Sequence, residues 1–265
     1  MEHIIDQDRY PLERSDGKAY SDLVAHAQAA LQQDGLFNLP GFLAEKALAQ
    51  TLEHLRPRLA TESFHHARWH NIYFKDTVEG LDPNDPALRK LKTSNHTLCH
   101  DQVQNTPLDR LYTWQPFIDF MAKVVGRGRL YRAEDPLSGV NVMEYRAGEA
   151  LNWHFDRSYF TTTLLLQRPD IGGAFEYVQD LRSDTDPNHK GIAEMLRGTP
   201  PPKVLEQEPG TLNVFLGQNT AHRVTPPEGT RPRIVAVFSY YDQPGVRFSA
   251  QEQLGFYGRV GQGRP

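Results

Sequence analysis

Two histidines and one aspartate in the second half of the sequence could bind a transition metal. His154 and Asp156 are separated by one residue, and His222 follows further along the chain. Two imidazoles and one carboxylate on one face of an iron ion leave the other coordination positions open, and this arrangement is typical of non-haem Fe(II) oxygenases. A His-x-Asp triplet alone is weak support for a metal site, so the assignment depends on the elements around it.

The elements around these residues are predicted to be short β-strands. The segments are rich in Val, Leu, Thr, Phe and Tyr, and Gly, Pro, Asn or Asp flank each one. They span residues 140–145, 160–167, 174–178, 203–207, 211–216 and 233–240. The triplet lies between the first two strands, after a turn at Gly148, where a turn could direct both side chains to one point. Regularly spaced short strands predict a β-sandwich or barrel.

The N-terminal half has a helical period instead. Apolar residues recur at three- and four-residue steps over three segments, and a proline interrupts the last of them. These segments are residues 21–34, 44–59 and 108–125. Residues 35–42 are predicted to form a short strand and turn. Residues 61–106 are polar and rich in His and Asn, and we expect long loops with short helical pieces there.

We expect a single domain over residues 1–265. Within it, residues 1–129 would form a helical and loop portion and residues 130–245 the β-rich core, with a helix near residues 191–196 inside an insertion. Residues 246–265 end in a glycine-rich sequence, so a mobile tail is predicted.

Composition excludes several classes of protein. The formal net charge is −4 and the pI about 6.3, so no basic field favours a nucleic-acid partner or an anionic membrane. No signal peptide is evident, and no apolar run approaches the roughly 18 residues that a membrane span needs. The one cysteine, Cys99, excludes an internal disulfide and fits a reducing compartment. We therefore expect a cytoplasmic protein without nucleic-acid or membrane partners; the oligomeric state is not determined by the sequence.

Several segments make the sequence similar to the Fe(II)/2-oxoglutarate-dependent dioxygenase family. They are HFD at 154–156, GGAFEYV at 172–178, PGTLNVFLG at 209–217, HRVTPPEGTRPRIVAVFSYY at 222–241 and, before the core, GLFNLPGFL at 35–43. The resemblance covers roughly residues 130–245. It implies an α+β, mainly β fold, with N-terminal helices packed on a double-stranded β-helix, or jelly roll.

The resemblance also implies the catalytic machinery. His154, Asp156 and His222 would be the iron ligands, with 2-oxoglutarate as co-substrate and O₂ as oxidant. A basic residue after the second histidine would bind the C5 carboxylate of 2-oxoglutarate. Arg233 is the first candidate, because alternation along its strand keeps it on one face, and Arg231, in the preceding turn, is the second.

The carboxylate of Asp156 bears on the type of reaction. The resemblance extends to small enzymes that act on free amino acids, and the chlorinases among them have a glycine at this position. Here we expect hydroxylation of an unactivated C–H bond of a small polar metabolite, such as an amino acid or derivative, with release of succinate and CO₂. Leu151 and Arg157 stand where that group has polar residues that bind the amino acid, so its lysine specificity is not transferred.

Two other functions remain open at this point. The same iron chemistry could carry out desaturation, epimerisation or cyclisation. Alternatively, the chain could be a jelly-roll protein that binds a metal or a sugar without catalysis.

Other polar residues are candidates for the site. Asn141 and Tyr145 share one face of their strand and could bind 2-oxoglutarate, although burial with backbone partners would explain them equally well. Candidates for substrate contacts are Arg157, Trp153, Asn95 and His96. A solvated rim position is the alternative for the arginine, and packing is the alternative for the tryptophan.

Three histidines form a further cluster, at His65, His66 and His70, next to Trp69. The cluster could be a lid over the substrate or a second metal site. No carboxylate or thiolate lies at a matching spacing in the sequence, which disfavours the metal.

Overall fold

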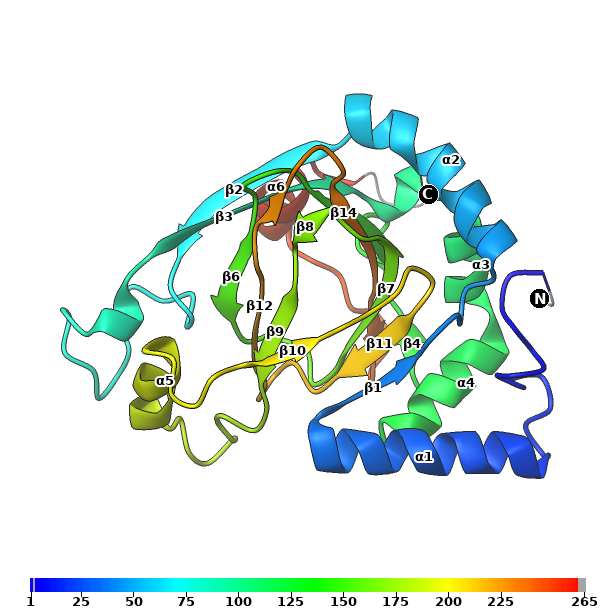
Figure 1. Cartoon of the computed structure of the whole chain (residues 1–265), viewed down its shortest axis with the longest axis horizontal. Helices are drawn as coiled ribbons and strands as arrows, with labels where there is room; N and C mark the ends of the chain where they lie inside the picture. Colours follow the sequence, from blue (N-terminus) through cyan, green and yellow to red (C-terminus); the bar gives the residue numbers. More distant parts are fainter. Residues whose placement is uncertain (2, 262–265) are drawn as a thin grey trace.

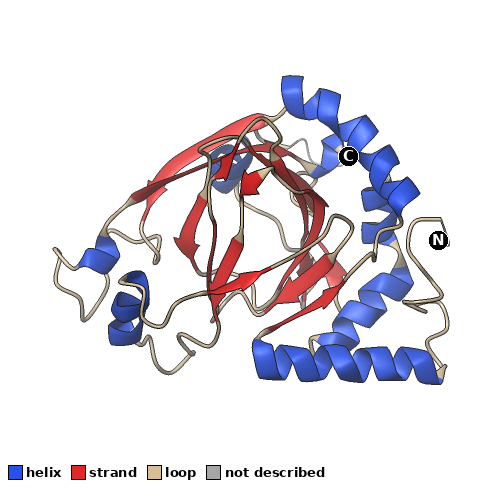
Figure 2. Cartoon of the chain, in the orientation of Figure 1, coloured by secondary structure: helices blue, strands red, loops and turns tan. Residues whose placement is uncertain are grey.

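The structure is a computed structural model that describes residue 1 and residues 3–261, and its helices α1 to α4 gather on one side of two β-sheets (Figures 1 and 2). The α-helices among the described residues are α1 (Lys18–Asp34), α2 (Glu45–Thr61), α3 (Pro107–Thr113), α4 (Gln115–Val124), α5 (His189–Leu196) and α6 (Ala250–Tyr257). Two short 3₁₀ helices are η1 (Pro86–Leu88) and η2 (His100–Gln102). No helix in the described part of the chain has the length and apolar character to cross a membrane.

The larger sheet has seven strands in the order β1-β11-β7-β14-β5-β3-β2. In chain order these are β1 (Leu36–Leu39), β2 (Phe64–His70), β3 (Leu91–Leu98), β5 (Val140–Tyr145), β7 (Thr161–Gln167), β11 (Leu212–Phe215) and β14 (Arg233–Phe238). Every neighbouring pair is antiparallel.

The smaller sheet has the order β10-β9-β12-β6 and is also antiparallel. Its strands are β6 (Leu151–His154), β9 (Phe175–Val178), β10 (Lys203–Leu205) and β12 (Ala221–Val224). Two short pairs join β8 (Ile171–Gly172) to β13 (Pro227–Glu228) and β4 (Tyr131–Arg132) to β15 (Tyr240–Tyr241). The two main sheets face each other, with the Phe175 and Phe215 rings 5.1 Å apart between them (Figure 1). The fold is therefore the expected double-stranded β-helix.

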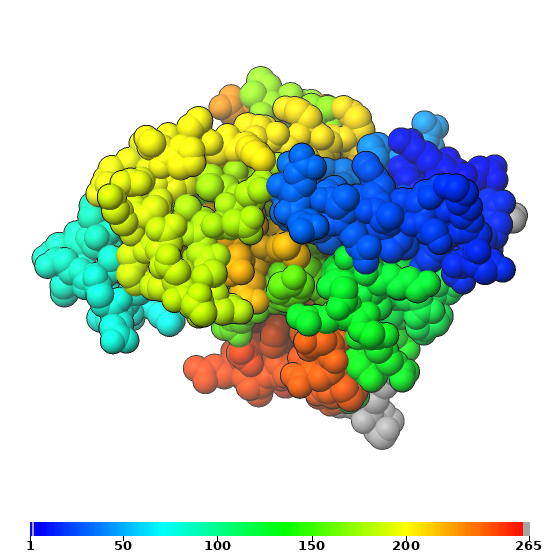
Figure 3. All heavy atoms as spheres, turned by 90° about the horizontal axis from the view of Figure 1, so that it is seen from below, coloured from blue at the N-terminus to red at the C-terminus, as the bar shows by residue number. Residues whose placement is uncertain are grey.

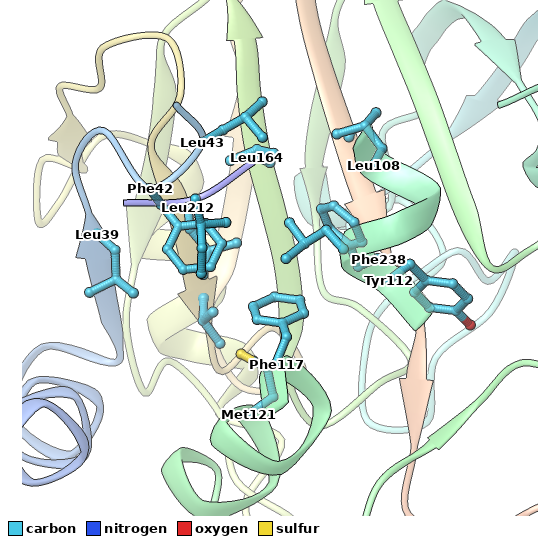
Figure 4. Close-up of a cluster of buried hydrophobic side chains, with 14 of the residues drawn as sticks. Leu39, Phe42, Leu43, Leu108, Tyr112, Phe117, Met121, Leu164, Leu212 and Phe238 are labelled. Carbon is cyan, nitrogen blue, oxygen red and sulfur yellow. The ribbon is translucent and has the colours of Figure 1, made fainter. Parts of the chain in front are cut away.

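The larger sheet has two chemically different faces. On β14, Ile234, Ala236 and Phe238 belong to the main hydrophobic core together with residues of α1 to α4, whereas the alternate residue Arg233 faces the inside of the barrel. Figure 4 shows this core, in which Phe117 and Met121 of α4 meet strand residues such as Leu164. Because strand side chains alternate between faces, one apolar face can pack on helices while the other carries polar groups inward.

Most predicted elements are confirmed. The expected strands correspond to β5, β7, β9, β10, β11 and β14, and the expected helices to α1, α2, α5 and the pair α3 and α4, which separates just before Pro116. The short strand predicted within 35–42 is β1, which pairs with β11 at the sheet edge.

The prediction for residues 61–106 was wrong in part. This segment contains β2 and β3, which pair along their whole length and extend the larger sheet. Strand β2 reads FHHARWH and alternates in exposure, but His, Arg and Ala are weak strand formers. Its strand conformation is stabilised by pairing with β3 rather than by its own composition.

The predicted mobile tail also differs from the structure. Helix α6 lies within residues 246–265 and is docked on the barrel, because Tyr257 Oη donates a hydrogen bond to Asn141 Oδ1 (3.3 Å) and Gln253 Nε2 donates to Asp135 Oδ2 (2.7 Å). Residues 262–265 of the predicted tail lie outside the described residues.

Two long insertions meet at one end of the barrel. The loop between β2 and β3 (cyan) lies against the 181–202 insertion (yellow), which contains α5 (Figures 1 and 3). Tyr73 Oη and His189 Nδ1 are 3.2 Å apart across this contact. These insertions border the end of the barrel at which β6 terminates.

Phe117 tests the importance of the helix–sheet core. Its ring is fully buried and lies close to the rings of Phe42, Phe238 and Tyr240. We expect Phe117→Ala to lower the free energy of unfolding by about 3–5 kcal/mol, because it removes a buried ring and leaves a cavity. Urea denaturation followed by circular dichroism measures this loss. The control Val204→Ala, at a half-exposed edge position, should stay within about 0.5 kcal/mol; equal effects of the two changes would contradict the assignment.

Candidate metal centre

The three predicted metal ligands meet inside the barrel. His154 is the last residue of β6, and His222 of β12 lies directly opposite it in the register of the two strands. Asp156 follows two residues after His154, and its backbone N–H donates to Gly217 O (3.0 Å). A Cβ atom at Gly217 would stand 2.3 Å from Asp156 Oδ2, so this position needs glycine.

The two imidazoles direct the same atom toward Asp156. His154 Nε2 is 3.4 Å from Asp156 Oδ1, and His222 Nε2 is 3.5 Å from the same oxygen. The opposite ring nitrogens are held by backbone carbonyls: His154 Nδ1 lies 2.8 Å from Asn152 O, and His222 Nδ1 lies 2.9 Å from Thr220 O. A neutral imidazole that donates through Nδ1–H has a lone pair on Nε2.

This orientation suits a cation rather than a hydrogen-bonded triad. Burial, reinforced by the neighbouring His222 ring, lowers the pKa of His154. Burial alone raises the pKa of Asp156, but the two imidazoles outweigh it and hold that pKa well below its usual value. Thr161 Oγ1 donates to Asp156 Oδ2 (2.5 Å), so Oδ1 is left to face the two nitrogens. Lone pairs of two nitrogens and one carboxylate oxygen therefore converge, which is the donor set of a divalent metal with imidazole and carboxylate ligands.

Arg233 lies on the larger sheet with its charge inside the protein. The residue is 5% exposed, and within the described part of the chain its Nη1 has no hydrogen-bond partner. Burial lowers the pKa of Arg233, yet a guanidinium stays protonated in proteins. A buried, unpaired cation is costly, so the position is suited to an anionic ligand that arrives from outside the chain.

Tyr145 lies next to this cation on the neighbouring strand. It lies opposite Arg233 in the register of β5 and β14, and its Oη reaches only the weak acceptor Met143 Sδ, at 3.7 Å. Burial raises the pKa of Tyr145 to about 12; the charge of Arg233 lowers this pKa, and the charges of Glu149 and Asp156 raise it. A hydroxyl donor therefore lies beside the arginine, within electrostatic range of the metal ligands. These groups fit the C5 carboxylate of 2-oxoglutarate.

The two remaining candidates for the co-substrate do not have free groups. Arg231 is exposed, and its Nε lies 3.1 Å from Asp170 Oδ1. Asn141 faces the barrel interior, but its Nδ2 donates to Leu137 O (2.7 Å) and its Oδ1 accepts from Tyr257 (3.3 Å). The amide of Asn141 thus connects β5 to α6.

Of the residues predicted to contact the substrate, only Asn95 lies on the inner face of the sheet. It is buried, on the same face as its cross-strand partner His66, and accepts a hydrogen bond from Thr97 Oγ1. His96 lies on the opposite face of β3. Trp153 points away from the triad into a separate apolar cluster, and Arg157 is exposed and paired with Glu252 at 2.8 Å. Because side chains alternate along a strand, Trp153 and His96 lie on the faces of their strands that point away from the triad.

A group on β2 and its following loop was missed by the sequence analysis. The Arg68 guanidinium lies over the Phe74 ring at 4.3 Å, and that ring is 5.9 Å from the His154 ring. Arg68 Nε is buried and, among the described residues, has no hydrogen-bond partner. Burial, followed by the nearby charge of Arg157, lowers the pKa of Arg68. In the sequence, only the aromatic residues Phe64 and Trp69 hinted at a strand in this segment.

His70 lies behind Phe74 in this group. Its Nε2 lies 2.6 Å from Thr93 Oγ1, its Nδ1 lies 2.9 Å from Asn71 O, and its ring stacks on Phe74 at 4.3 Å. Burial lowers the pKa of His70 to about 4. With both ring nitrogens engaged, His70 positions Phe74 rather than offering a free group to a ligand.

Comparison with known proteins places the chain in a family. A family model described as Halogenase D matches residues 20–252. No protein of curated function matches the sequence. Among solved structures, the epimerase SnoN from nogalamycin biosynthesis is 16% identical with a TM-score of 0.58, over 84% of this chain and 83% of that one.

Two further solved structures have the same fold. AviO1 from Streptomyces viridochromogenes Tue57 is 20% identical, with a TM-score of 0.55, over 84% of this chain and 96% of that one. A 2OG-Fe(II) oxygenase family oxidoreductase from Burkholderia pseudomallei is 15% identical, with a TM-score of 0.52, over 84% and 92%. The match to the family model covers most of the chain, and the predicted resemblance is confirmed: the chain belongs to the Halogenase D family of the Fe(II)/2-oxoglutarate-dependent oxygenases.

Proposed function

We propose that the protein is an Fe(II)- and 2-oxoglutarate-dependent hydroxylase of a small polar metabolite that carries an anionic group. His154, Asp156 and His222 would hold the iron, and Arg233 with Tyr145 would hold the C5 carboxylate of 2-oxoglutarate. The observation that carries this proposal is a buried convergence of metal-ligand lone pairs close to a buried arginine without a hydrogen-bond partner at Nη1 in the described chain. The SnoN structure determined with Fe³⁺ and alpha ketoglutarate has the same fold, which supports this pair of cofactors.

The chain's own residues would bind and orient the reactants. Bound Fe(II) supplies the oxidation, in which O₂ and 2-oxoglutarate give succinate, CO₂ and one oxygen atom for the substrate C–H bond. Arg233 and Tyr145 fix the far end of the co-substrate, so its other end is directed toward the metal ligands. The rings of Phe74 and Phe175 lie 5.9 and 5.6 Å from those of His154 and His222 and give the centre an apolar border.

Asp156 favours hydroxylation over halogenation within this family. Its Oδ1 lies between the two Nε2 atoms, at the position where the halogenating relatives have glycine and a halide binds. The hydrogen bond from Thr161 holds this carboxylate in place. With the third ligand position filled by protein, no halide site remains among these three residues.

Arg68 supports an anionic substrate group. Its guanidinium is half-buried, lies over Phe74 near the metal ligands, and projects from the same face of the sheet as Asn95 and Thr93. A planar guanidinium recognises carboxylates and phosphates in a bidentate manner. An amino acid or a related carboxylate of small size would satisfy this residue while presenting a C–H bond to the metal centre.

A metabolite screen tests the proposed function directly. We expect small carboxylates to stimulate Fe(II)-dependent succinate release, whereas their amides should not, and the product should gain one oxygen atom by mass spectrometry. Loss of two hydrogen atoms would instead indicate desaturation or cyclisation. A protein that releases no succinate with any substrate would contradict enzymatic function.

Removal of the carboxylate ligand should abolish turnover. Loss of a residue that only hydrogen-bonds to a metal ligand lowers metal affinity or activity by about 10–100-fold. Because Asp156 would bind the metal itself, we expect Asp156→Ala to lower Fe(II) affinity and succinate formation by more than this. Asp242→Asn, at an exposed carboxylate, is the control and should retain full activity. Full turnover in the Asp156 variant would disprove the iron assignment.

Arg233 should determine the affinity for the co-substrate. We expect Arg233→Gln to raise the KM for 2-oxoglutarate at least about 30-fold, since truncation of one partner of a buried charge pair costs about 2–5 kcal/mol. The matched control Arg231→Gln should leave this KM unchanged, because Arg231 is exposed and paired with Asp170. Equal effects of the two substitutions would reject the assignment of the anchor.

Arg68 should affect the affinity for the substrate and not the affinity for 2-oxoglutarate. We expect Arg68→Gln to raise the substrate KM about tenfold or more, as hydrogen bonds to charged groups contribute about 1.5–3 kcal/mol. The KM for 2-oxoglutarate should not change. Arg157→Gln is the control, because that arginine is exposed and paired with Glu252; a substrate KM that responds only to Arg157→Gln would contradict the role of Arg68.

A further inference from the structure

A second cluster of potential metal ligands lies on the other face of the larger sheet. His65 of β2 and His96 of β3 are directly opposite each other in the strand register, and their rings stack with centroids 4.7 Å apart. Glu149, in the turn between β5 and β6, reaches the same point. The neighbouring residues His66 and Asn95 face the barrel interior, so this cluster is separate from the proposed active site.

The distances within the cluster match those expected for metal coordination. His65 Nε2 is 3.3 Å and His96 Nε2 is 3.4 Å from the same atom, Glu149 Oε1. All three potential ligand atoms lie within 4.8 Å of one another. Bonds of about 2.0–2.1 Å to a tetrahedral ion place neighbouring ligand atoms about 3.3 Å apart. The two nitrogen–oxygen distances are those of such a tetrahedron.

Hydrogen bonds around the cluster orient the lone pairs inward. Ser63 Oγ donates its proton to Leu59 O (2.6 Å), so at the 3.4 Å contact with His96 Nδ1 the imidazole N–H is the donor. His96 Nε2 then has a lone pair directed at Glu149. The other carboxylate oxygen of Glu149, Oε2, accepts from the Arg146 N–H (2.8 Å). The same orientation, with Nδ1 held and Nε2 facing a carboxylate oxygen, occurs at His154 and His222.

Charges of both signs surround the cluster: Arg146 disfavours positive charge at His96, whereas Glu149 and Glu144 favour it. The side chain of Arg146 is paired with Glu144, with Nε 2.6 Å from Oε1, so its charge is already balanced. The Glu149 side chain is 13% exposed and that of His65 is 51% exposed, which leaves one side of the cluster open to solvent. A water molecule could therefore fill a fourth position, as in sites with two histidines and one glutamate.

We propose that His65, His96 and Glu149 bind a divalent metal ion of the zinc type, independently of the catalytic iron. Imidazole and carboxylate ligands in a tetrahedral arrangement are those that Zn²⁺ prefers. The ion would connect the β2–β3 hairpin to the turn that precedes β6. It would thereby fix the strand that carries Arg68 on its inner face.

Metal titration of the chelator-treated full chain tests this proposal. We expect isothermal titration calorimetry with Zn²⁺ to show two ions per wild-type chain and one per Asp156→Ala chain. In the Asp156→Ala background, His65→Ala and Glu149→Gln should each weaken the remaining site by about 100-fold or more. His54→Ala, an exposed histidine on α2, is the matched control and should bind Zn²⁺ as the parent does.

Two readouts keep the outcomes distinguishable. Circular dichroism checks that each variant is folded, and His65 is exposed enough that its loss should not affect folding. The proposal is supported if His65→Ala and Glu149→Gln each remove the Zn²⁺ ion that the Asp156→Ala chain still binds. The same two changes, made in the wild-type background, should leave succinate formation unchanged. Unchanged Zn²⁺ affinity after both His65→Ala and Glu149→Gln would overturn it, and the cluster would then be a hydrogen-bonded His–Glu–His group. The loss of Zn²⁺ affinity on His65→Ala does not depend on the iron assignment, whereas the count of two ions includes the ion at His154, Asp156 and His222.

Discussion

The imidazoles of His154 and His222 converge on one oxygen of Asp156 inside the protein, and the surrounding structure holds the three side chains in this arrangement. Carbonyl groups of Asn152 and Thr220 fix both rings. The hydroxyl of Thr161 fixes the carboxylate. In a medium of low dielectric such an arrangement is costly without a cation. The pairing of β6 with β12 supplies the rigidity that keeps the three side chains together.

The polar interior of the barrel is balanced by an apolar core on the outer face of the same sheet. Strand β14 illustrates this: Arg233 points inward without an anionic partner in the described chain, while Ile234 and Ala236 pack against the helices. The N-terminal helices therefore do more than cover the sheet. They bury apolar surface that stabilises the fold, while the polar groups of the proposed site lie on the other face of the sheet, in agreement with the general observation that functional sites depart from the rules of stable packing.

The β2–β3 hairpin connects the two proposed metal centres. Its inner face carries Arg68 and Asn95 toward the proposed iron site, and its outer face carries His65 and His96 toward Glu149. Because strand side chains alternate, residues adjacent in sequence serve different sites. The histidine cluster noted in the sequence is thus divided: His65 belongs to the outer centre, whereas His66 and His70 lie on the inner face. The carboxylate that the sequence spacing did not provide comes from the turn between β5 and β6.

The jelly-roll core could be predicted from the sequence, because short β-branched and aromatic segments with turn residues have a strong local signal. The convergence of His154, Asp156 and His222 could be predicted because the motifs around them resemble those of a known family. The hairpin containing Arg68 could not be predicted, since its strands are polar and are stabilised by pairing with distant β5. Helix α6 was missed for a similar reason, as contacts of Tyr257 and Gln253 with the barrel hold it. Tertiary structure alone decided which face Trp153, His96 and Arg157 occupy and which arginine is buried without an anion. Those properties depend on strand register and on partners far apart in the chain, and local sequence patterns determine neither.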